Sequence, residues 1–169
     1  MRMPVLFVGH GSPMNAIETN VFSSQWKVLA EKIPRPKAIL AVSAHWYTEG
    51  TRTHDTEHPK TVYDMYGFPP ELYRVTYPAQ GAPELARRTA GLLPVPAAID
   101  NGWGYDHGAW SVLVHMYPQA DIPLYQLSVD RTASAQEHFE MGQALSILRE
   151  EGVLILGSGN VVHNLALVN

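Results

Sequence analysis

The sequence AILAVSAHW, at residues 38–46, joins five consecutive apolar residues to a polar end that contains a histidine. A strand with one face in water alternates polar and apolar residues, whereas the run at 38–42 has no polar member. An uninterrupted apolar run is typical of a parallel strand that is buried on both faces. This stretch therefore predicts an interior strand of a parallel sheet, with His45 at its end.

Strand-like and helix-like segments alternate along the rest of the chain. Four more short apolar runs have the length of strands, at residues 5–8, 95–99, 122–129 and 153–156. Helical spacing of apolar residues, or a proline at a helix start, marks residues 26–33, 83–92, 109–117 and 141–148. This alternation predicts an α/β fold, a single domain with a central, mainly parallel sheet flanked by helices.

Composition narrows the classes of function. The chain has 169 residues, a formal net charge of −4 and no cluster of basic residues, which argues against nucleic-acid binding. It has no cysteine, so any metal must be held by His, Asp, Glu or backbone oxygen. There is no apolar stretch of the roughly 18 residues that a membrane-spanning helix needs, and no signal-peptide pattern. We expect a cytoplasmic protein with no membrane partner. The sequence does not indicate an oligomeric state.

Residues 49–80 are polar, aromatic and rich in proline, without a clear period, and are predicted to form a long loop. A loop of this length inside a compact domain is usually functional, or else its assignment is wrong. Its aromatic residues Tyr63, Tyr66 and Phe68, together with Trp46, are candidates for an aromatic pocket. An equally good interpretation is that these aromatic side chains anchor the core or the loop.

Three histidines follow predicted strands. His10 follows the strand at 5–8 after one glycine, His45 ends the segment that begins with the run at 38–42, and His163 lies a short glycine-rich turn after the strand at 153–156. If the strands are parallel, all three imidazoles reach the same edge of the sheet, where open α/β sheets bind their ligands. Neutral imidazoles bind zinc and ferrous iron, so this edge is a candidate metal site. A histidine in a turn is more often structural, and that alternative stays open.

His107 lies in the glycine-rich segment 102–108, next to Asp106. A histidine near a bound substrate can move protons at neutral pH, because its unperturbed pKa is about 6.5. The alternative is that Asp106 and His107 cap the helix expected from Ala109. The sequence pattern favours neither interpretation over the other.

Four motifs in a fixed order carry a resemblance to a known family. They are VGHGSPMN at 8–15, SAHW at 43–46, YDHGAW at 105–110 and GSGNVVHNL at 157–165. Together they resemble the 4,5-DOPA dioxygenase extradiol family, within the class III extradiol ring-cleavage dioxygenases and related to the catalytic subunit of protocatechuate 4,5-dioxygenase. The resemblance runs from residue 3 to the end of the chain.

This resemblance implies an enzyme, an extradiol catechol dioxygenase that opens a catechol such as L-DOPA with O₂ at a non-haem Zn²⁺ or Fe²⁺. It implies that His10 and His45 are metal ligands and that His107 is a catalytic acid/base. His163 matches a position that serves as a metal ligand in some members and as a catalytic acid/base in others, and we assign it both roles.

The resemblance also implies that family members continue beyond the length of this chain and take a final metal ligand, His or Glu, from that later part. Residues 1–169 are therefore expected to form a single catalytic domain, truncated at the C-terminus relative to the family, with an exposed apolar patch.

Two alternatives to a dioxygenase remain. One is a non-enzymatic metal- or ligand-binding protein on the same scaffold. The other is a metal-inserting chelatase, which would share the Gly-His-Gly-Ser strand end and leave the other motifs unexplained.

Overall fold

All strands of the computed structural model, which describes residues 2–161, belong to one six-stranded sheet in the order β1-β6-β2-β5-β3-β4. The strands are β1 (Val5–Val8), β2 (Ala38–Thr48), β3 (Thr51–Thr53), β4 (Ala97–Ile99), β5 (Leu124–Asp130) and β6 (Val153–Ser158). Strands β1, β6, β2 and β5 are parallel to one another, and β3 is antiparallel to β5. The predicted α/β fold with a mainly parallel sheet is confirmed.

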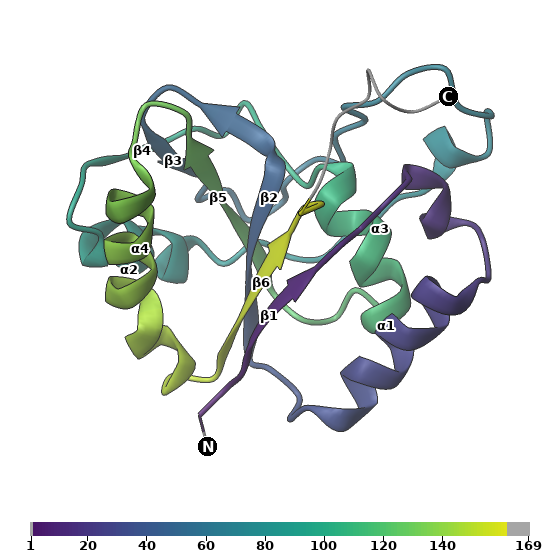
Figure 1. The fold of residues 1–169 in the computed structure, drawn as a ribbon, viewed down its shortest axis with the longest axis horizontal. Helices are drawn as coiled ribbons and strands as arrows, with labels where there is room; N and C mark the ends of the chain where they lie inside the picture. Colours follow the sequence, from purple (N-terminus) through teal and green to yellow (C-terminus); the bar gives the residue numbers. More distant parts are fainter. Residues whose placement is uncertain (1, 162–169) are drawn as a thin grey trace.

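Helices cover both sides of this sheet. They are α1 (Val21–Lys32), α2 (Pro83–Leu92), α3 (His107–Met116) and α4 (Ala135–Ala144), with short 3₁₀ turns at Pro13–Ala16, Leu72–Arg74 and Leu145–Arg149. Figure 1 shows α1 and α3 together on one side of the sheet and α2 and α4 on the other. None of the helices within residues 2–161 is long and apolar enough to cross a membrane.

Strand β2 is buried on both faces, as its uninterrupted apolar run predicts. Ile39 and Ala41 point into the core cluster shared with α1 and α3. Ala38 and Leu40 point into a second cluster on the side of α2. Successive side chains of a strand point to opposite faces, so a strand between two helical layers must be apolar at every position.

The sheet differs from the predictions in one strand end and in one strand that lies within the predicted loop at 49–80. Strand β2 continues to Thr48 instead of ending near residue 42, so His45 lies within the strand, close to its carboxyl end. Strand β3 was not predicted, because its sequence, Thr-Arg-Thr, has no apolar signal. Its threonines are nevertheless buried, and Thr53 donates its hydroxyl hydrogen to the backbone carbonyl of Gln126 at 2.8 Å. Hydrogen bonding replaces apolar patterning in this strand.

His54 follows β3 and is part of the core. Its side chain is 1% exposed and lies between the rings of Trp46 and Tyr105, at centroid distances of 5.9 and 5.6 Å. The ring Nε2 accepts a hydrogen bond from the backbone N–H of Gln126 at 3.2 Å. Burial lowers the pKa of His54 to about 4, because a charged imidazolium is poorly solvated in this position.

This lowered pKa predicts a loss of stability in mild acid. Between pH 6.5 and about 4 the unfolded chain binds a proton at this site and the folded chain does not, so the free energy of unfolding falls as the pH falls. One pKa unit corresponds to about 1.4 kcal/mol, which limits the total effect to about 3 kcal/mol. We expect His54→Phe to flatten the pH dependence of urea unfolding in this range. A variant of the exposed His58, His58→Ala, should keep the wild-type slope; an unchanged slope in His54→Phe would contradict the prediction.

The edge strand β1 exposes apolar side chains. Val5 and Phe7 are 53% and 65% exposed, and they point to the side opposite Val8, which is buried in the core. A groove next to Val5, between the sheet and α4, is lined mainly by apolar residues, among them Val42, Met141 and Ile155. Exposed apolar surface is therefore present at the edge of the sheet formed by β1.

Candidate metal centre

The register of three neighbouring strands places His10 and His45 at equivalent positions. In the sheet, Val8 pairs with Ser158 of β6, and Ser158 pairs with Ser43 of β2. His10 and His45 each come two residues after these paired positions, on either side of the end of β6. Two side chains that leave the same sheet edge in the same direction can meet above the strand between them. The predicted meeting of His10 and His45 is confirmed.

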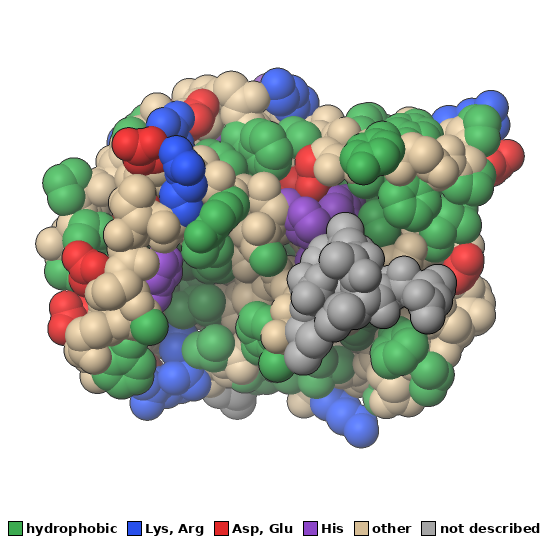
Figure 2. Space-filling view, turned by 45° about the horizontal axis from the view of Figure 1, so that its top comes forward, with side chains coloured by type: hydrophobic (Ala, Val, Ile, Leu, Met, Phe, Trp, Pro, Cys, Tyr) green, Lys and Arg blue, Asp and Glu red, His purple; other side chains and the backbone are tan. Residues whose placement is uncertain are grey.

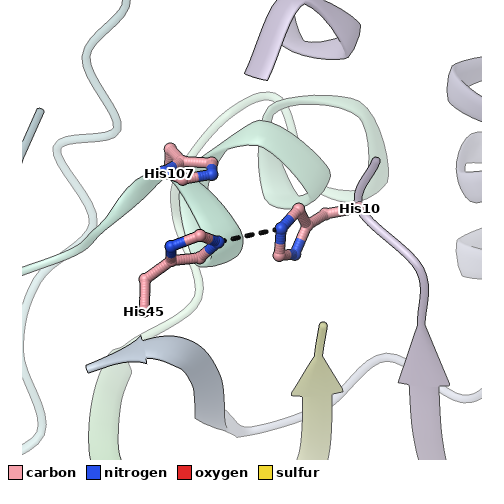
Figure 3. Close-up of side chains that lie close together, drawn as sticks. All are labelled: His10, His45 and His107. Atoms are coloured by element: carbon pink, nitrogen blue, oxygen red, sulfur yellow. Dashed lines mark hydrogen bonds between the residues drawn. The ribbon is translucent and has the colours of Figure 1, made fainter. Parts of the chain in front are cut away.

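His107 joins them from the first residue of α3. One ring nitrogen from each of His10, His45 and His107 can be chosen so that all three lie within 4.8 Å of one another. The Nε2 atoms of His10 and His45 are 3.0 Å apart, and the rings of His45 and His107 have a centroid distance of 3.8 Å. Figure 3 shows the three rings converging from the segment after β1, from β2 and from the start of α3. In Figure 2 histidine side chains reach the surface near the centre of the face shown.

The side chain of Ser158 holds the ring of His10. Ser158 Oγ donates its hydrogen to the backbone carbonyl of Gly108 at 2.5 Å and lies 2.9 Å from His10 Nδ1. Because the serine hydrogen is already used, the serine oxygen accepts from His10, and Nδ1 is the protonated nitrogen. His10 is 1% exposed, so this contact takes place away from solvent.

Asp64, from the predicted long loop, holds the other two rings. Its Oδ2 lies 2.9 Å from His107 Nδ1 and 3.3 Å from His45 Nδ1, and its Oδ1 accepts from the backbone N–H of His107 at 2.9 Å. Burial by itself would raise the pKa of this carboxyl. The hydrogen bonds and charge of His107, with the charge of His45, outweigh burial and hold the pKa of Asp64 below its ordinary value.

Asp106 positions the helix that carries His107. Its side chain is fully buried and accepts hydrogen bonds from Ser43 Oγ at 2.6 Å, Gln126 Nε2 at 2.9 Å and Trp103 Nε1 at 3.2 Å. It also caps α3 by accepting from the backbone N–H of Ala109. Burial raises the pKa of Asp106, and the hydrogen bonds from its neighbours oppose that shift. The capping interpretation of Asp106 is confirmed, and His107 joins the histidine cluster as well.

The approach of α3 to β2 depends on the absence of a side chain at Gly108. A Cβ at this position would lie 2.4 Å from Ser43 Oγ and 3.1 Å from His45 Cδ2. Real Cβ atoms do not come as close as 2.4 Å to another heavy atom, so an alanine here would displace the start of the helix. The glycine after His107 therefore lets that ring reach His45.

The donor set fits a metal ion. A ring nitrogen from each of three histidines can face a common point, and imidazole nitrogen is a ligand for zinc and ferrous iron. The Nδ1 atoms of His10 and His107 already donate to protein acceptors, which leaves Nε2 as the nitrogen with a lone pair. Outer partners of this kind, carboxylate or hydroxyl, commonly orient metal-binding histidines.

The other predicted site residues have different outcomes. His163, assigned to the metal and to catalysis, lies outside the described residues. Trp46, a candidate for the aromatic pocket, is 2% exposed and stacks on Trp103, so it belongs to the core. Tyr66 is 92% exposed. Tyr63 is half-buried, contacts the ring of Trp110 and donates its hydroxyl hydrogen to the carbonyl of Val75, as expected for a loop anchor.

Sequence reasoning missed Asp64, Ser158 and Gln126 as parts of the site. Ser158 falls within the motif at 157–165, which gave it no role, and none of the four motifs contains Asp64 or Gln126. Their roles depend on contacts with residues 20 to 148 positions away in the chain. The one available signal was the length of the loop at 49–80, which indicated a function without indicating a residue.

Comparison with known proteins places this geometry in a family. The model of the catalytic LigB subunit of aromatic ring-opening dioxygenase matches residues 4–168, nearly the whole chain. The chain belongs to the LigB family. The predicted resemblance to extradiol ring-cleavage dioxygenases is thereby confirmed.

Two curated proteins and one solved structure are similar to nearly the whole of this chain. The 4,5-DOPA dioxygenase extradiol of Escherichia coli is 53% identical over 99% of this chain, and that of Beta vulgaris is 44% identical over 93% of it. The crystal structure of an uncharacterized Escherichia coli K12 protein, JW3007, superposes with a TM-score of 0.83 at 49% identity and covers 99% of this chain.

These similar proteins are longer than this chain. The matched region makes up 62% of the Escherichia coli dioxygenase, 61% of the Beta vulgaris protein and 64% of the chain in the crystal structure. The chain thus spans about three fifths of the length of the curated relatives that it matches. Their names describe proteins that include the additional length.

Proposed function

We propose that this protein is an extradiol dioxygenase that opens the ring of a catechol such as L-DOPA with O₂ at a metal held by His10 and His45. The observation that carries the proposal is the convergence of ring nitrogens from His10, His45 and His107 at the carboxyl edge of a LigB-family sheet. His163 is proposed as a further metal contact and acid/base. The names of the relatives favour ring cleavage over the chelatase alternative.

The metal is Zn²⁺ or Fe²⁺ by its ligand chemistry, and Fe²⁺ is the ion proposed for ring opening. When bound, the ion supplies Lewis-acid polarisation and a common template for the catechol and O₂. The reaction breaks the O–O bond and the ring carbon–carbon bond next to the diol, and both oxygen atoms enter one ring-opened product. The protein's own residues supply position, exclusion of water and proton transfer.

His107 is proposed as the general acid/base. Its Nδ1 donates to Asp64, so its Nε2 is the atom that accepts a proton from a catechol hydroxyl and returns it later. The carboxylate of Asp64, 2.9 Å away, stabilises the imidazolium that forms in between. His107 is 4% exposed and His10 1%, so bulk water has little access to these two rings.

Oxygen uptake tests the proposed function. We expect protein loaded anaerobically with Fe²⁺ to consume one O₂ for each catechol and to form a yellow ring-opened product, with L-DOPA included in a panel of catechols. Fe²⁺ with catechol and no protein is the control. Metal binding without oxygen uptake above this control would identify a non-enzymatic binding protein and would reject the dioxygenase.

The proposal also includes a cytoplasmic location. The proposed partners are small molecules only, a catechol and O₂.

A further inference from the structure

Asp64 makes three contacts with the histidine cluster through one carboxylate. Oδ1 accepts from the backbone N–H of His107, and Oδ2 accepts from His107 Nδ1, both at 2.9 Å. The same Oδ2 lies 3.3 Å from His45 Nδ1. The side chain of Asp64 is 11% exposed, so these contacts face little competition from water.

We propose that Asp64 is a positioning residue, which fixes the ring orientation and tautomer of His107 and restrains His45, so that the Nε2 atoms of both rings face the metal centre. The inference rests on the proposed function, and it assigns to the long loop the task of organising the site.

The tautomer follows from the chemistry of the contact. An ionised carboxylate is an acceptor only, so the ring nitrogen that faces it must carry the hydrogen. In a neutral His107 the hydrogen is therefore on Nδ1, and Nε2 keeps its lone pair. His10 reaches the same state through Ser158. His10 and His107 are thus set to the same tautomer by two different partners. Nε2 of the proposed ligand and Nε2 of the proposed acid/base therefore both keep their lone pair.

The loop holds Asp64 in place through a short backbone ladder. Val62 donates its N–H to the carbonyl of Tyr105 at 2.7 Å, and Tyr105 donates to the carbonyl of Lys60 at 2.8 Å. Trp110 of α3 adds a bond from Nε1 to the carbonyl of Val62 at 3.0 Å. A Cβ at Gly104 would lie 2.0 Å from the carbonyl oxygen of Lys60, so this close approach requires glycine. The carboxylate therefore projects from a restrained segment, as a positioning group should.

A purely structural role makes a different prediction. If Asp64 served only to tether the loop to the start of α3, its loss would lower stability and leave the His107 ring unchanged. The two roles separate in Asp64→Asn, which has nearly the same shape. An asparagine in the same place has an acceptor oxygen at only one of the two positions that Oδ1 and Oδ2 of Asp64 occupy. The backbone N–H of His107 can only donate, so it takes the oxygen and leaves the NH₂ group to face the ring. When NH₂ faces the ring, Nδ1 must accept, and the hydrogen moves to Nε2.

The test combines a spectroscopic and a binding measurement. ¹⁵N NMR of the imidazole nitrogens in metal-free protein, assigned with His107→Gln, should show the Nδ1–H form of His107 in the wild type and the Nε2–H form in Asp64→Asn. Zinc affinity should fall by about 10–100-fold, because Asp64 is also the outer partner of the proposed ligand His45, and loss of such a partner usually has an effect of this size. In catechol turnover kcat should fall more than KM changes, since a wrong tautomer in a Ser-His-Asp triad lowers kcat by about 10⁴-fold.

Asp55→Asn is the matched control. Asp55 is also partly buried, with 19% of its side chain exposed, and its partners are Arg87 and Asn101. The Asp55→Asn variant should keep the wild-type tautomer of His107. Asp64→Glu, which retains both acceptor oxygens, should keep the Nδ1–H form as well, and it covers the case in which Asp64→Asn does not fold.

Two results would overturn the proposal: an unchanged tautomer and zinc affinity in Asp64→Asn, or an Nε2–H form of His107 in Asp64→Glu. These measurements do not depend on turnover. If the wild-type protein consumes no O₂ with catechols, the proposed function fails, and the tautomer and zinc data still decide the role of Asp64.

Discussion

His107→Ala is expected to lower kcat for catechol ring opening by about 10²–10⁴-fold, the usual contribution of a general acid or base. Its ring faces the cluster while Asp64 holds Nδ1. Alanine removes the atom that takes the hydroxyl proton and leaves His10 and His45 in place. Bound zinc or iron should therefore stay near the wild-type level.

The measurement pairs oxygen uptake with metal analysis of the same preparations. His58→Ala, which removes an exposed histidine, should retain wild-type turnover. An equal loss of metal and activity in His107→Ala would contradict the acid/base role and would make His107 a third ligand. Its position within 4.8 Å of the other two ring nitrogens gives this outcome a structural basis.

His45→Ala is expected to weaken zinc binding by more than about 100-fold, because it removes a ligand, whereas loss of an outer partner costs about 10–100-fold. Of His10 and His45, His45 is better suited to this experiment. Its side chain is 26% exposed, against 1% for His10 as a whole, so alanine leaves a smaller cavity in the core. The unfolding midpoint of the metal-free variant should remain close to that of the wild type.

Isothermal titration with Zn²⁺ measures this effect, and His58→Ala again provides the control. Wild-type zinc affinity in His45→Ala would mean that the ion is bound elsewhere. The proposed centre at the ends of β1 and β2 would then be wrong, whatever the activity of the protein.

Much of the fold could be read from the sequence, because burial leaves a direct trace in residue type. The run at 38–42 is apolar at every position, since β2 lies between two helical layers. The boundaries of β1 and α2 also agree with the apolar pattern and the proline at a helix start. Strand β3 could not be read in this way, because Thr51 and Thr53 are buried through hydrogen bonds.

The sequence also determined the candidate histidines, because parallel strands bring their carboxyl ends to one edge of the sheet. His10 and His45 follow from that rule, and the motif around His107 follows from the family resemblance. Their spacing along the chain determines the edge of the sheet that they reach. It does not determine the direction of each ring or the nitrogen that carries its hydrogen.

Tertiary structure alone decided those two properties. Asp64 is 43 residues from His107, and Ser158 is 148 residues from His10. Each contact sets a tautomer, and each depends on the relative placement of loop, strand and helix to within a few tenths of an ångström. Hydrogen bonds weaken steeply with distance and angle, so a pattern of residue types cannot specify them. Strand order therefore predicts that His10 and His45 meet, the family resemblance adds His107, and the packing of distant segments sets how the rings are held.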